Sequence, residues 1–455
     1  MDLTAAGLVS VGLLLLVGLS LFGLTSLRER EQRAARLALA LAIATSLPFF
    51  LVALLPLQIQ TVVLAVVALA AALLLVLFFL PIGRVERGND VPRSRVDERD
   101  IMFARARLEP GTPNYETYYA LRPEKQASDD KTRSLPGLLS LEAREAHPLV
   151  FASTEATFSL IEELQGAVEG PVAPERVETE PGVMTAYLKG LTRHLGARSV
   201  GVCELKPYHI YSHIGRGPGE YGAPVTLDHR YAIAFAVEMD REMTSTAPTA
   251  PTTLESANQY ARAANIAVQL ALLIRSLGYP ARAHIDGNYR VIAPLVARDA
   301  GLGEFGRMGL LMTPTLGPRI RLGVVTTDLP LILDQRGDDT SVLDFCRVCK
   351  KCAETCPVRA IPFGDRAEMD GALRWRINDD LCFRYWNVAG TDCARCMAMC
   401  PYSYPDSALH NLVRWAARRS GFARRAVIWL DRVFYGATPG PRPAPDWVPP
   451  QPEQI

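Results

Sequence analysis

Two long stretches without charged residues open the chain. Residues 3–27 carry no charge and consist mostly of Leu, Val, Ala, Gly and Phe. That length suffices for a helix across the hydrocarbon core of a bilayer, which takes about 20 apolar residues. Residues 37–83 are also uncharged, and as one helix they would extend about 70 Å, far beyond a core of about 30 Å. Because Pro56, Gln58 and Gln60 mark a break, the pattern predicts three membrane-spanning helices over 3–27, 37–56 and 60–82.

Charges beside these helices predict their orientation. Arginines stand at positions 28, 30, 33 and 36 between the first two helices, and at 84, 87, 93 and 95 after the third. The turn between the second and third helices has no charge. Positive residues favour the cytoplasmic side, and three spans put both arginine clusters on one side. An uncleaved signal fits the first stretch less well, since a signal peptide needs a positive amino-terminal region and a shorter apolar core. We therefore expect a multi-pass protein of the inner membrane, with the lipid bilayer as a partner and residues 84–455 in the cytoplasm.

Strand-like and helix-like patterns alternate in the rest of the chain. Residues 232–237 and 322–326 are apolar and predict short strands, whereas 257–277 has apolar residues three and four apart and predicts a helix. Such alternation is typical of α/β or α+β proteins, and we expect the α/β class. The expected regions are a transmembrane anchor over 1–83, an irregular juxtamembrane segment over 84–135, a core over 136–340, a cysteine-rich module over 341–405, and a C-terminal helix with a Pro-rich tail over 406–455.

The overall charge argues against a broad nucleic-acid-binding surface. Of 49 basic and 48 acidic residues, all but four and three lie after residue 83, so residues 84–455 are neutral overall. Proteins that bind nucleic acid usually carry a basic face. We expect no nucleic-acid partner.

Eight of the nine cysteines lie between residues 346 and 400. Cys346, Cys349, Cys352 and Cys356 form a C-x2-C-x2-C-x3-C-P motif, and after Cys382 a C-x2-C-x3-C-P motif follows at Cys393, Cys396 and Cys400. In two-cluster ferredoxins the cysteine before the proline binds the other cluster. We therefore expect one [4Fe–4S] cluster on Cys346, Cys349, Cys352 and Cys400, and a second on Cys382, Cys393, Cys396 and Cys356. A zinc ribbon is the alternative, because paired C-x2-C units also bind zinc, but two such complete motifs favour clusters.

The stretch before the cysteines resembles a known family. Leu-Leu-Ile-Arg-Ser-Leu-Gly-Tyr-Pro-Ala-Arg (272–282), Ala-Gly-Leu-Gly-Glu-Phe-Gly-Arg (300–307), Gly-Pro-Arg-Ile-Arg-Leu-Gly (317–323) and Thr-Asp-Leu-Pro-Leu (327–331) precede the cluster motifs. Together they resemble the cobalamin-dependent reductive dehalogenases, relatives of epoxyqueuosine reductase, over about residues 95–405. The resemblance implies a nitroreductase-like core that holds base-off cobalamin beside a ferredoxin-like module with two [4Fe–4S] clusters. Respiratory members carry a twin-arginine signal and use a separate small anchor protein, whereas this chain has its own predicted spans.

The same resemblance implies candidate site residues. Tyr260 looks like the tyrosine that gives the substrate its proton, Arg321 or Arg319 looks like its cationic partner, and Asn288 could lie between them. Gly301, Gly303 and Gly306 resemble a phosphate-binding loop, but this motif alone is weak. In this context the three glycines, with Arg319, are expected to allow close approach to the corrinoid.

The implied chemistry agrees with elementary acid–base rules. A free phenol has a pKa of about 10, and a nearby cation lowers it by favouring the anion. The leading hypothesis is a membrane-anchored reductive dehalogenase that removes halide from an organohalide, with electrons from a reductase, ferredoxin or flavodoxin. One alternative is a membrane-bound iron–sulfur electron-transfer protein without a corrinoid. Another is a tRNA-modifying reductase, which predicts a basic face that the neutral charge balance does not support.

Overall fold

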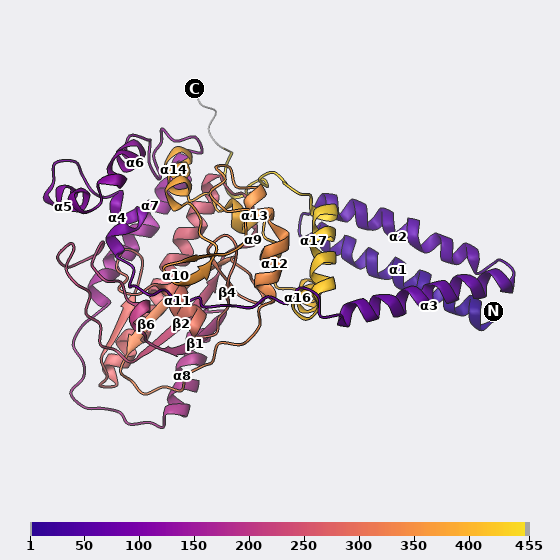
Figure 1. Ribbon diagram of the computed structural model, residues 1–455, viewed down its shortest axis with the longest axis horizontal. Helices are drawn as coiled ribbons and strands as arrows, with labels where there is room; N and C mark the ends of the chain where they lie inside the picture. The colour runs from indigo at the N-terminus through magenta and orange to yellow at the C-terminus, as the bar shows by residue number, and fades with distance from the viewer. Residues whose placement is uncertain (1, 451–455) are drawn as a thin grey trace. The chain divides into compact units, whose positions relative to one another are not determined.

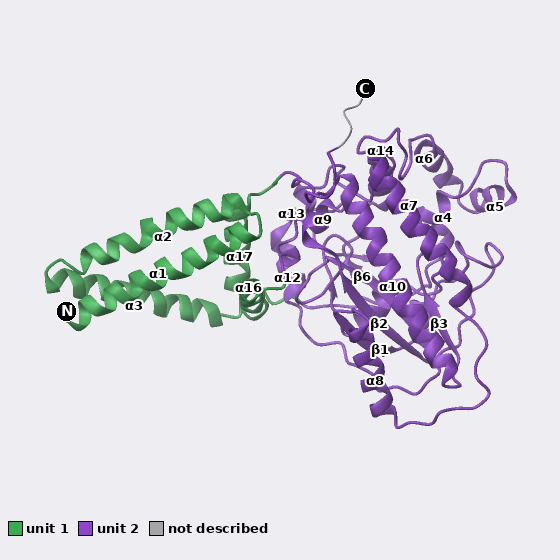
Figure 2. Cartoon of the chain, turned by 180° about the vertical axis from the view of Figure 1, so that it is seen from behind, with its two compact units in different colours: residues 1–85, 406–439 green, residues 86–405, 440–455 purple. Residues whose placement is uncertain are grey.

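The computed structural model describes residues 2–450 and divides the chain into two compact units (Figures 1 and 2). Unit 1 comprises residues 1–85 and 406–439, and unit 2 comprises 86–405 and 440–455. Residues 1 and 451–455, at the ends of the expected anchor and of the expected tail, lie outside the described part. Unit 1 is therefore built from both ends of the sequence.

Unit 1 consists of three long helices and two shorter ones. These are α1 (Leu3–Arg28), α2 (Gln32–Val52), α3 (Leu57–Phe79), α16 (Ala408–Arg419) and α17 (Gly421–Tyr435). Helices α1 to α3 are long and apolar enough to cross a membrane, which confirms the three expected helices. Helices α2 and α3 begin earlier than expected. Helix α2 includes Arg33 and Arg36 in its first turns, since long arginine side chains can extend from a helix end toward water.

Small residues let α1 and α2 pack closely against each other. The buried positions of α2 are Ala34, Ala35, Ala38, Ala42 and Ser46, and those of α1 are likewise Ala, Gly, Ser or a single Leu. The large Leu, Val and Phe side chains point outward. This arrangement is the reverse of a water-soluble bundle and is typical of helices that pack in lipid, where small residues let backbones approach closely.

A buried glutamine closes the turn between α2 and α3. The Gln60 side-chain amide donates to the carbonyls of Ala53 (3.0 Å) and Leu55 (2.8 Å), and its oxygen accepts from the Thr4 hydroxyl at 3.0 Å. Carbonyls at a helix end otherwise lack partners, which is costly in an apolar environment. Gln60 thus satisfies the end of one helix and ties it to α1.

Unit 2 is built around a four-stranded sheet in the order β1-β2-β6-β3. Its strands are β1 (Ser199–Glu204), β2 (Tyr231–Glu238), β3 (Ala281–His284) and β6 (Ile320–Thr327). All three pairings are antiparallel, so the expected α/β class needs correction: the parallel sheet that this class implies is absent among the described strands, and the arrangement is α+β. The alternation of strands and helices along the chain does not by itself fix strand direction.

Alternating residues of β2 build a core on each face of the sheet. Ile233, Phe235 and Val237 pack with α10 (Ala250–Ser276), α8 (Pro181–His194) and α7 (Pro148–Glu163). Ala232, Ala234 and Ala236 pack with α11 (Ala293–Asp299). Because a strand has a side-chain period of two, large residues on one face and alanines on the other let the short helix α11 approach closely. Figure 1 shows α10 alongside the sheet.

Residues 84–135 contain more regular structure than expected. Helices α4 (Met102–Arg105), α5 (Pro113–Leu121) and α6 (Pro123–Arg133) occupy much of this segment. Their starts carry helix signals: Pro113 and Pro123 stand in the first turns, and the Thr112 side chain caps α5. The correction has a clear cause, since these helices are polar and lack the apolar period from which the sequence analysis predicted helices.

The remaining elements are short and lie mostly around the cysteines. They are α9 (Arg241–Ser245), α12 (Ser341–Cys349), α13 (Lys351–Glu354), α14 (Asp379–Ala389), α15 (Arg395–Ala398), the hairpins β4 (Glu304–Phe305) with β5 (Leu311–Met312) and β7 (Ala367–Met369) with β8 (Ala372–Arg374), and the 3-10 turns 98–100, 164–167, 207–209 and 401–403. They belong to the same compact unit as the sheet. Where one C-terminal helix was expected, the chain forms α16 and α17 and groups them with the amino-terminal helices.

Candidate functional site

The first group of cysteines surrounds a tight helix-to-helix turn. Cys346 and Cys349 lie on α12 and Cys352 lies on α13, and Lys350 between them adopts a left-handed conformation with φ of 56°. This residue reverses the chain so that thiols from both helices face one centre. Burial raises the pKa of Cys352, and the neighbouring Cys346, Cys400 and Cys349 raise it further. Cys346, Cys349, Cys352 and Cys400 are therefore close neighbours, although Cys400 is far along the chain.

The second group forms in a similar way. Cys382 lies on α14, and Cys393 and Ala394 adopt left-handed conformations before α15, which carries Cys396. Burial raises the pKa of Cys382 to about 11, with Cys356 adding to it. Burial also raises the pKa of Cys393 to about 12, with contributions from Cys382 and Cys356. The pKa of Cys396 is raised by burial, by Cys382 and Cys393, and also by Cys352, so the two groups adjoin.

The raised pKa of Cys352, Cys382, Cys393 and Cys396, to which neighbouring thiols contribute, means that these thiols require a cation if they are to act as thiolate ligands. All nine cysteines are free of disulfides, and bound metal deprotonates a coordinating thiol outright. Arg307 supplies one fixed positive charge: it is fully buried and donates to the carbonyls of Cys346 (2.8 Å) and Gly364 (2.6 Å). Among residues 2–450 no group of three or more His, Cys, Asp or Glu side chains is close enough to hold a single metal ion. Four thiols in each group match the ligand set of a cubane cluster, in which each iron takes one thiolate. The chemistry of the two groups therefore fits iron–sulfur clusters.

Tyr260 and Arg321 come together beside the second group. Tyr260 lies on α10 and Arg321 on β6, and the guanidinium carbon lies 5.0 Å from the centre of the tyrosine ring. Arg321 also donates to the Ser256 hydroxyl at 2.7 Å and to the Asp392 carboxylate at 3.1 Å. Asp392 immediately precedes Cys393. One arginine thus contacts both the tyrosine and the cysteine-bearing loop.

Charged and aromatic side chains surround Tyr260. Tyr211, Arg216, Tyr260, Asp286 and Tyr289 are each partly accessible, yet burial raises the pKa of all three tyrosines, that of Tyr211 to about 12. Arg321 lowers the pKa of Tyr260, while Asp286 and Tyr260 both raise that of Tyr289. Tyr211, Tyr260 and Tyr289 interact with one another or with the same charged groups, so they lie close together in a part of unit 2 that is screened from solvent.

The other expected site residues have different surroundings. Asn288 is fully buried; its oxygen accepts from Arg282 at 2.7 Å, and its side-chain nitrogen has no hydrogen-bond partner among residues 2–450. A buried, unsatisfied donor indicates a missing partner. Arg319, in contrast, is buried against protein: it donates to the carbonyls of Ser403, at 2.9 Å, and Met239, and pairs with Glu238 at 2.8 Å. The structure thus brings Arg321, and not Arg319, to the tyrosine.

The glycine motif packs against protein atoms. A Cβ at Gly303 would lie 2.2 Å from the carbonyl oxygen of Met312, and one at Gly306 would lie 2.4 Å from the Met312 sulfur and 3.5 Å from the thiol of Cys346. Gly301 has φ of +79°, a conformation that L side chains rarely adopt. Close packing beside the first cysteine group explains these glycines without a ligand, and their part in cofactor binding stays a prediction.

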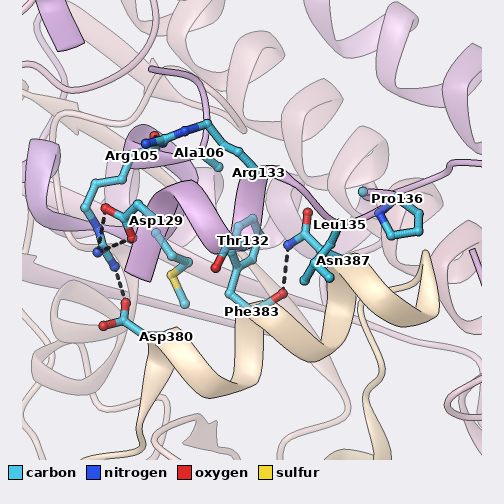
Figure 3. Close-up of a pocket in the computed structure, with 12 residues that line it drawn as sticks. Arg105, Ala106, Asp129, Thr132, Arg133, Leu135, Pro136, Asp380, Phe383 and Asn387 are labelled. Carbon is cyan, nitrogen blue, oxygen red and sulfur yellow. Dashed lines mark hydrogen bonds and ion pairs between the residues drawn. The ribbon is translucent and has the colours of Figure 1, made fainter. Parts of the chain in front are cut away.

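A small pocket of about 200 Å³ lies elsewhere, between α4, α6 and α14 (Figure 3). Arg105 donates to Asp129 at 2.8 Å and pairs with Asp380, and Asn387 donates to the carbonyl of Phe383 at 2.8 Å (Figure 3). Arg105 is thus paired with carboxylates of the pocket. We interpret these contacts as the ones that fix α4 and α6 to α14, the helix that carries Cys382.

Comparison with known proteins agrees with this site. A 4Fe-4S dicluster domain matches residues 345–404. Tetrachloroethene reductive dehalogenase of Sulfurospirillum multivorans is 31% identical over 294 residues, which cover 57% of this chain and 58% of that protein. Over these residues the chain is similar to a reductive dehalogenase. Its structure is similar, with a TM-score of 0.62 and 26% identity, to the catabolic reductive dehalogenase NpRdhA in complex with 3-bromo-4-hydroxybenzoic acid, covering 82% of this chain and 54% of that one. It is equally similar, with the same identity and coverage, to a reductive dehalogenase whose structure suggests a mechanism for B12-dependent dehalogenation.

The chain spans little more than half the length of these dehalogenases.

Two residues that position Arg321, Asp392 and Ser256, were not predicted from the sequence. An acidic residue next to a cluster cysteine was the available signal for Asp392, and the four-residue spacing of Ser256 and Tyr260, one helical turn apart on the same helix, was the signal for Ser256.

Proposed function

We propose that the chain is a membrane-anchored reductive dehalogenase. It would replace the halogen of an organohalide by hydrogen, with two electrons and one proton consumed and a halide ion released. The observation that carries this proposal is the position of Arg321, which contacts Tyr260 on one side and Asp392, next to Cys393, on the other. Proton donor and electron path would meet at this residue.

Two [4Fe–4S] clusters would be held by the two cysteine groups. Bound there, they pass electrons singly over short distances. Cys346, Cys349, Cys352 and Cys400 would hold one, and Cys356, Cys382, Cys393 and Cys396 the other, since each thiol interacts with members of its own group. The interaction between Cys396 and Cys352 joins the two groups and supports electron transfer between them.

Base-off cobalamin would bind beside Tyr211, Tyr260 and Tyr289. Bound there, it supplies a cobalt centre that can be reduced to attack an organohalide. Asn288 fits this group, because its buried amide nitrogen lacks a partner among the described residues and could donate to a polar edge of the ligand. The partly accessible Tyr211 and Tyr289 supply aromatic walls of the kind that bind small apolar ligands.

Tyr260 would give its proton to the substrate carbon. Burial raises its pKa, so the phenol is protonated at neutral pH and ready to donate. Arg321 lowers the pKa by favouring the anion, and it would stabilise the tyrosinate that remains. Ser256 and Asp392 hold the guanidinium in place, because a general acid must stay within reach of the atom it protonates.

The location follows from the anchor. We propose that α1 to α3 span the inner membrane and that unit 2 lies in the cytoplasm, since both arginine clusters are then on the cytoplasmic side. Electrons would come from a reductase, a ferredoxin or a flavodoxin.

The proposal is tested with the full chain, purified anaerobically in detergent with added cobalamin. We expect cobalt and iron to co-purify, EPR signals of Co(II) and of reduced clusters, and halide release from organohalides. Tyr260→Phe should abolish halide release and keep both metals, whereas Tyr187→Phe, at an exposed position on α8, should have no effect. A preparation that binds iron but neither binds cobalamin nor releases halide would instead support an electron-transfer protein.

A further inference from the structure

Helix α17 turns large apolar side chains outward. Its buried positions include two charged residues, Arg424 and Asp431. On the other side Trp429 is 63% exposed and Leu430 is 40% exposed. A helix of a water-soluble protein does the opposite and buries its apolar stripe. The outward face of α17 therefore lacks the partner that its chemistry requires.

Helix α16 continues this surface. Leu412 is 60% exposed and Trp415 is 48% exposed. Arg418 and Arg419 are exposed one turn further along, and the Arg419 guanidinium lies 5.2 Å from the centre of the Trp415 ring. Aromatic rings next to arginines, on a helix with one apolar face, are typical of helices that lie in the interface of a bilayer.

Contacts within unit 1 place both helices at one end of the three long helices. The Trp415 ring stacks on Phe78 in the last turn of α3, with ring centres 6.1 Å apart. Phe434 of α17 meets Phe22 of α1 edge to face at 5.0 Å, and it packs with Ala34 at the start of α2. Figures 1 and 2 show α17 running crosswise to α1–α3 at this end.

That end is also the positively charged one. Arginines 28, 30, 33 and 36 flank the junction of α1 and α2. Helices α16 and α17 add six arginines and one aspartate, a net charge of +5. A basic amphipathic surface at the boundary of membrane-spanning helices is complementary to anionic lipid headgroups, each basic residue near the surface contributing about 1 kcal/mol.

We propose that α16 and α17 lie in the membrane surface, with Trp415, Trp429 and their apolar neighbours inserted at the level of the headgroups and Arg418 and Arg419 on anionic phospholipid. The occupant of this face is the bilayer that holds α1–α3, with which it is continuous. The proposal depends on membrane insertion of the three long helices and not on dehalogenation chemistry.

The insertion is tested by tryptophan fluorescence of the full chain in nanodiscs, with and without phosphatidylcholine brominated at a shallow position of the acyl chain. We expect brominated lipid to quench part of the emission, and the Trp415→Phe/Trp429→Phe variant to lose that quenched part. Trp447→Phe, which removes an exposed tryptophan of unit 2, should keep it. Iron content checks that each variant is folded.

The headgroup preference is tested by EPR with spin-labelled phosphatidylglycerol and phosphatidylcholine. We expect the Arg418→Gln/Arg419→Gln variant to lose at least about half of the preference for phosphatidylglycerol, and the control Arg193→Gln/Arg359→Gln, at exposed positions of unit 2, to keep it. An unchanged preference would overturn the anionic-lipid assignment. Equal quenching in the double tryptophan variant and the wild type would overturn the insertion. Nanodiscs that contain two chains, with no quenching by brominated lipid, would also overturn it, because a second copy of the chain would then cover this face.

Discussion

Arginine 319 offers a sharp test of how the sheet supports the clusters. Its guanidinium is 1% exposed and donates to the carbonyls of Met239 and Ser403. Ser403 lies three residues after Cys400, a member of the first cysteine group. Arg319→Met keeps an unbranched apolar side chain and removes both hydrogen-bond donors. The substitution therefore breaks the contacts that tie the cluster-bearing segment to the start of β6.

The cost can be worked from these contacts. Each buried carbonyl that loses its donor costs about 1–3 kcal/mol, and the pair with the partly exposed Glu238 adds little. Methionine avoids the desolvation cost of a buried guanidinium, which offsets part of the loss. A net value of about 3 kcal/mol would raise the population of the opened segment roughly a hundredfold, since about 1.4 kcal/mol is a factor of ten.

The assay is the anaerobic rate at which a chelator removes iron from the holoprotein. We expect Arg319→Met to release about half of the iron, that of the first group, roughly a hundredfold faster than the wild type. Arg193→Met, at an exposed position of α8, is the control and should release iron at the wild-type rate. Wild-type rates of iron loss in Arg319→Met, or faster loss in both variants, would refute the reasoning.

Four further predictions follow from the site. Tyr260→Phe should reduce the rate of halide release by about 10²–10⁴-fold, the usual contribution of a general acid, without changing cobalt or iron content. Halide release should fall as pH rises through the raised pKa of Tyr260, because only the protonated phenol donates a proton. Arg321→Gln removes the cation that lowers this pKa, so it should move the fall to higher pH. A pH–rate profile whose alkaline side is the same in the variant and the wild type would contradict this. Gly303→Ala should destabilise unit 2 by at least about 2 kcal/mol, because its Cβ would meet a backbone oxygen at 2.2 Å, while Gly364→Ala, with open space around it, should melt like the wild type when cluster absorbance is followed. Cys356→Ser should lose about half of the iron and keep the EPR signal of one cluster.

The sequence predicted those features that depend on local pattern. Uncharged stretches specify the three long helices because the bilayer imposes one length and one polarity on every span. Cysteine spacing specifies two groups of thiols because a loop of fixed length can wrap only one centre. Both signals lie within a few dozen residues of chain, where the physics is independent of the rest of the fold.

Features that depend on distant partners could not be predicted in this way. Arg319, just before β6, and Arg321, within it, stand two residues apart and look equivalent in sequence. Arg319 donates to carbonyls of Met239 and Ser403, whereas Arg321 meets Tyr260. Only the three-dimensional packing separates them. Strand direction escaped for the same reason, since an apolar run such as 322–326 fits a parallel or an antiparallel neighbour equally well.

Unit 1 is discontinuous in sequence, and this has a practical consequence for the design of a water-soluble version of the protein. Deleting residues 1–85 alone would strip Phe434 of Phe22 and Ala34 and leave α16 and α17 with two uncovered apolar sides. Stopping the chain at residue 405 would also remove Val448, which packs with Phe151 and Ala250 in unit 2. A water-soluble derivative should therefore start near residue 86. It should join residue 405 to residue 440 through a linker, so that Val448 keeps its contacts with Phe151 and Ala250.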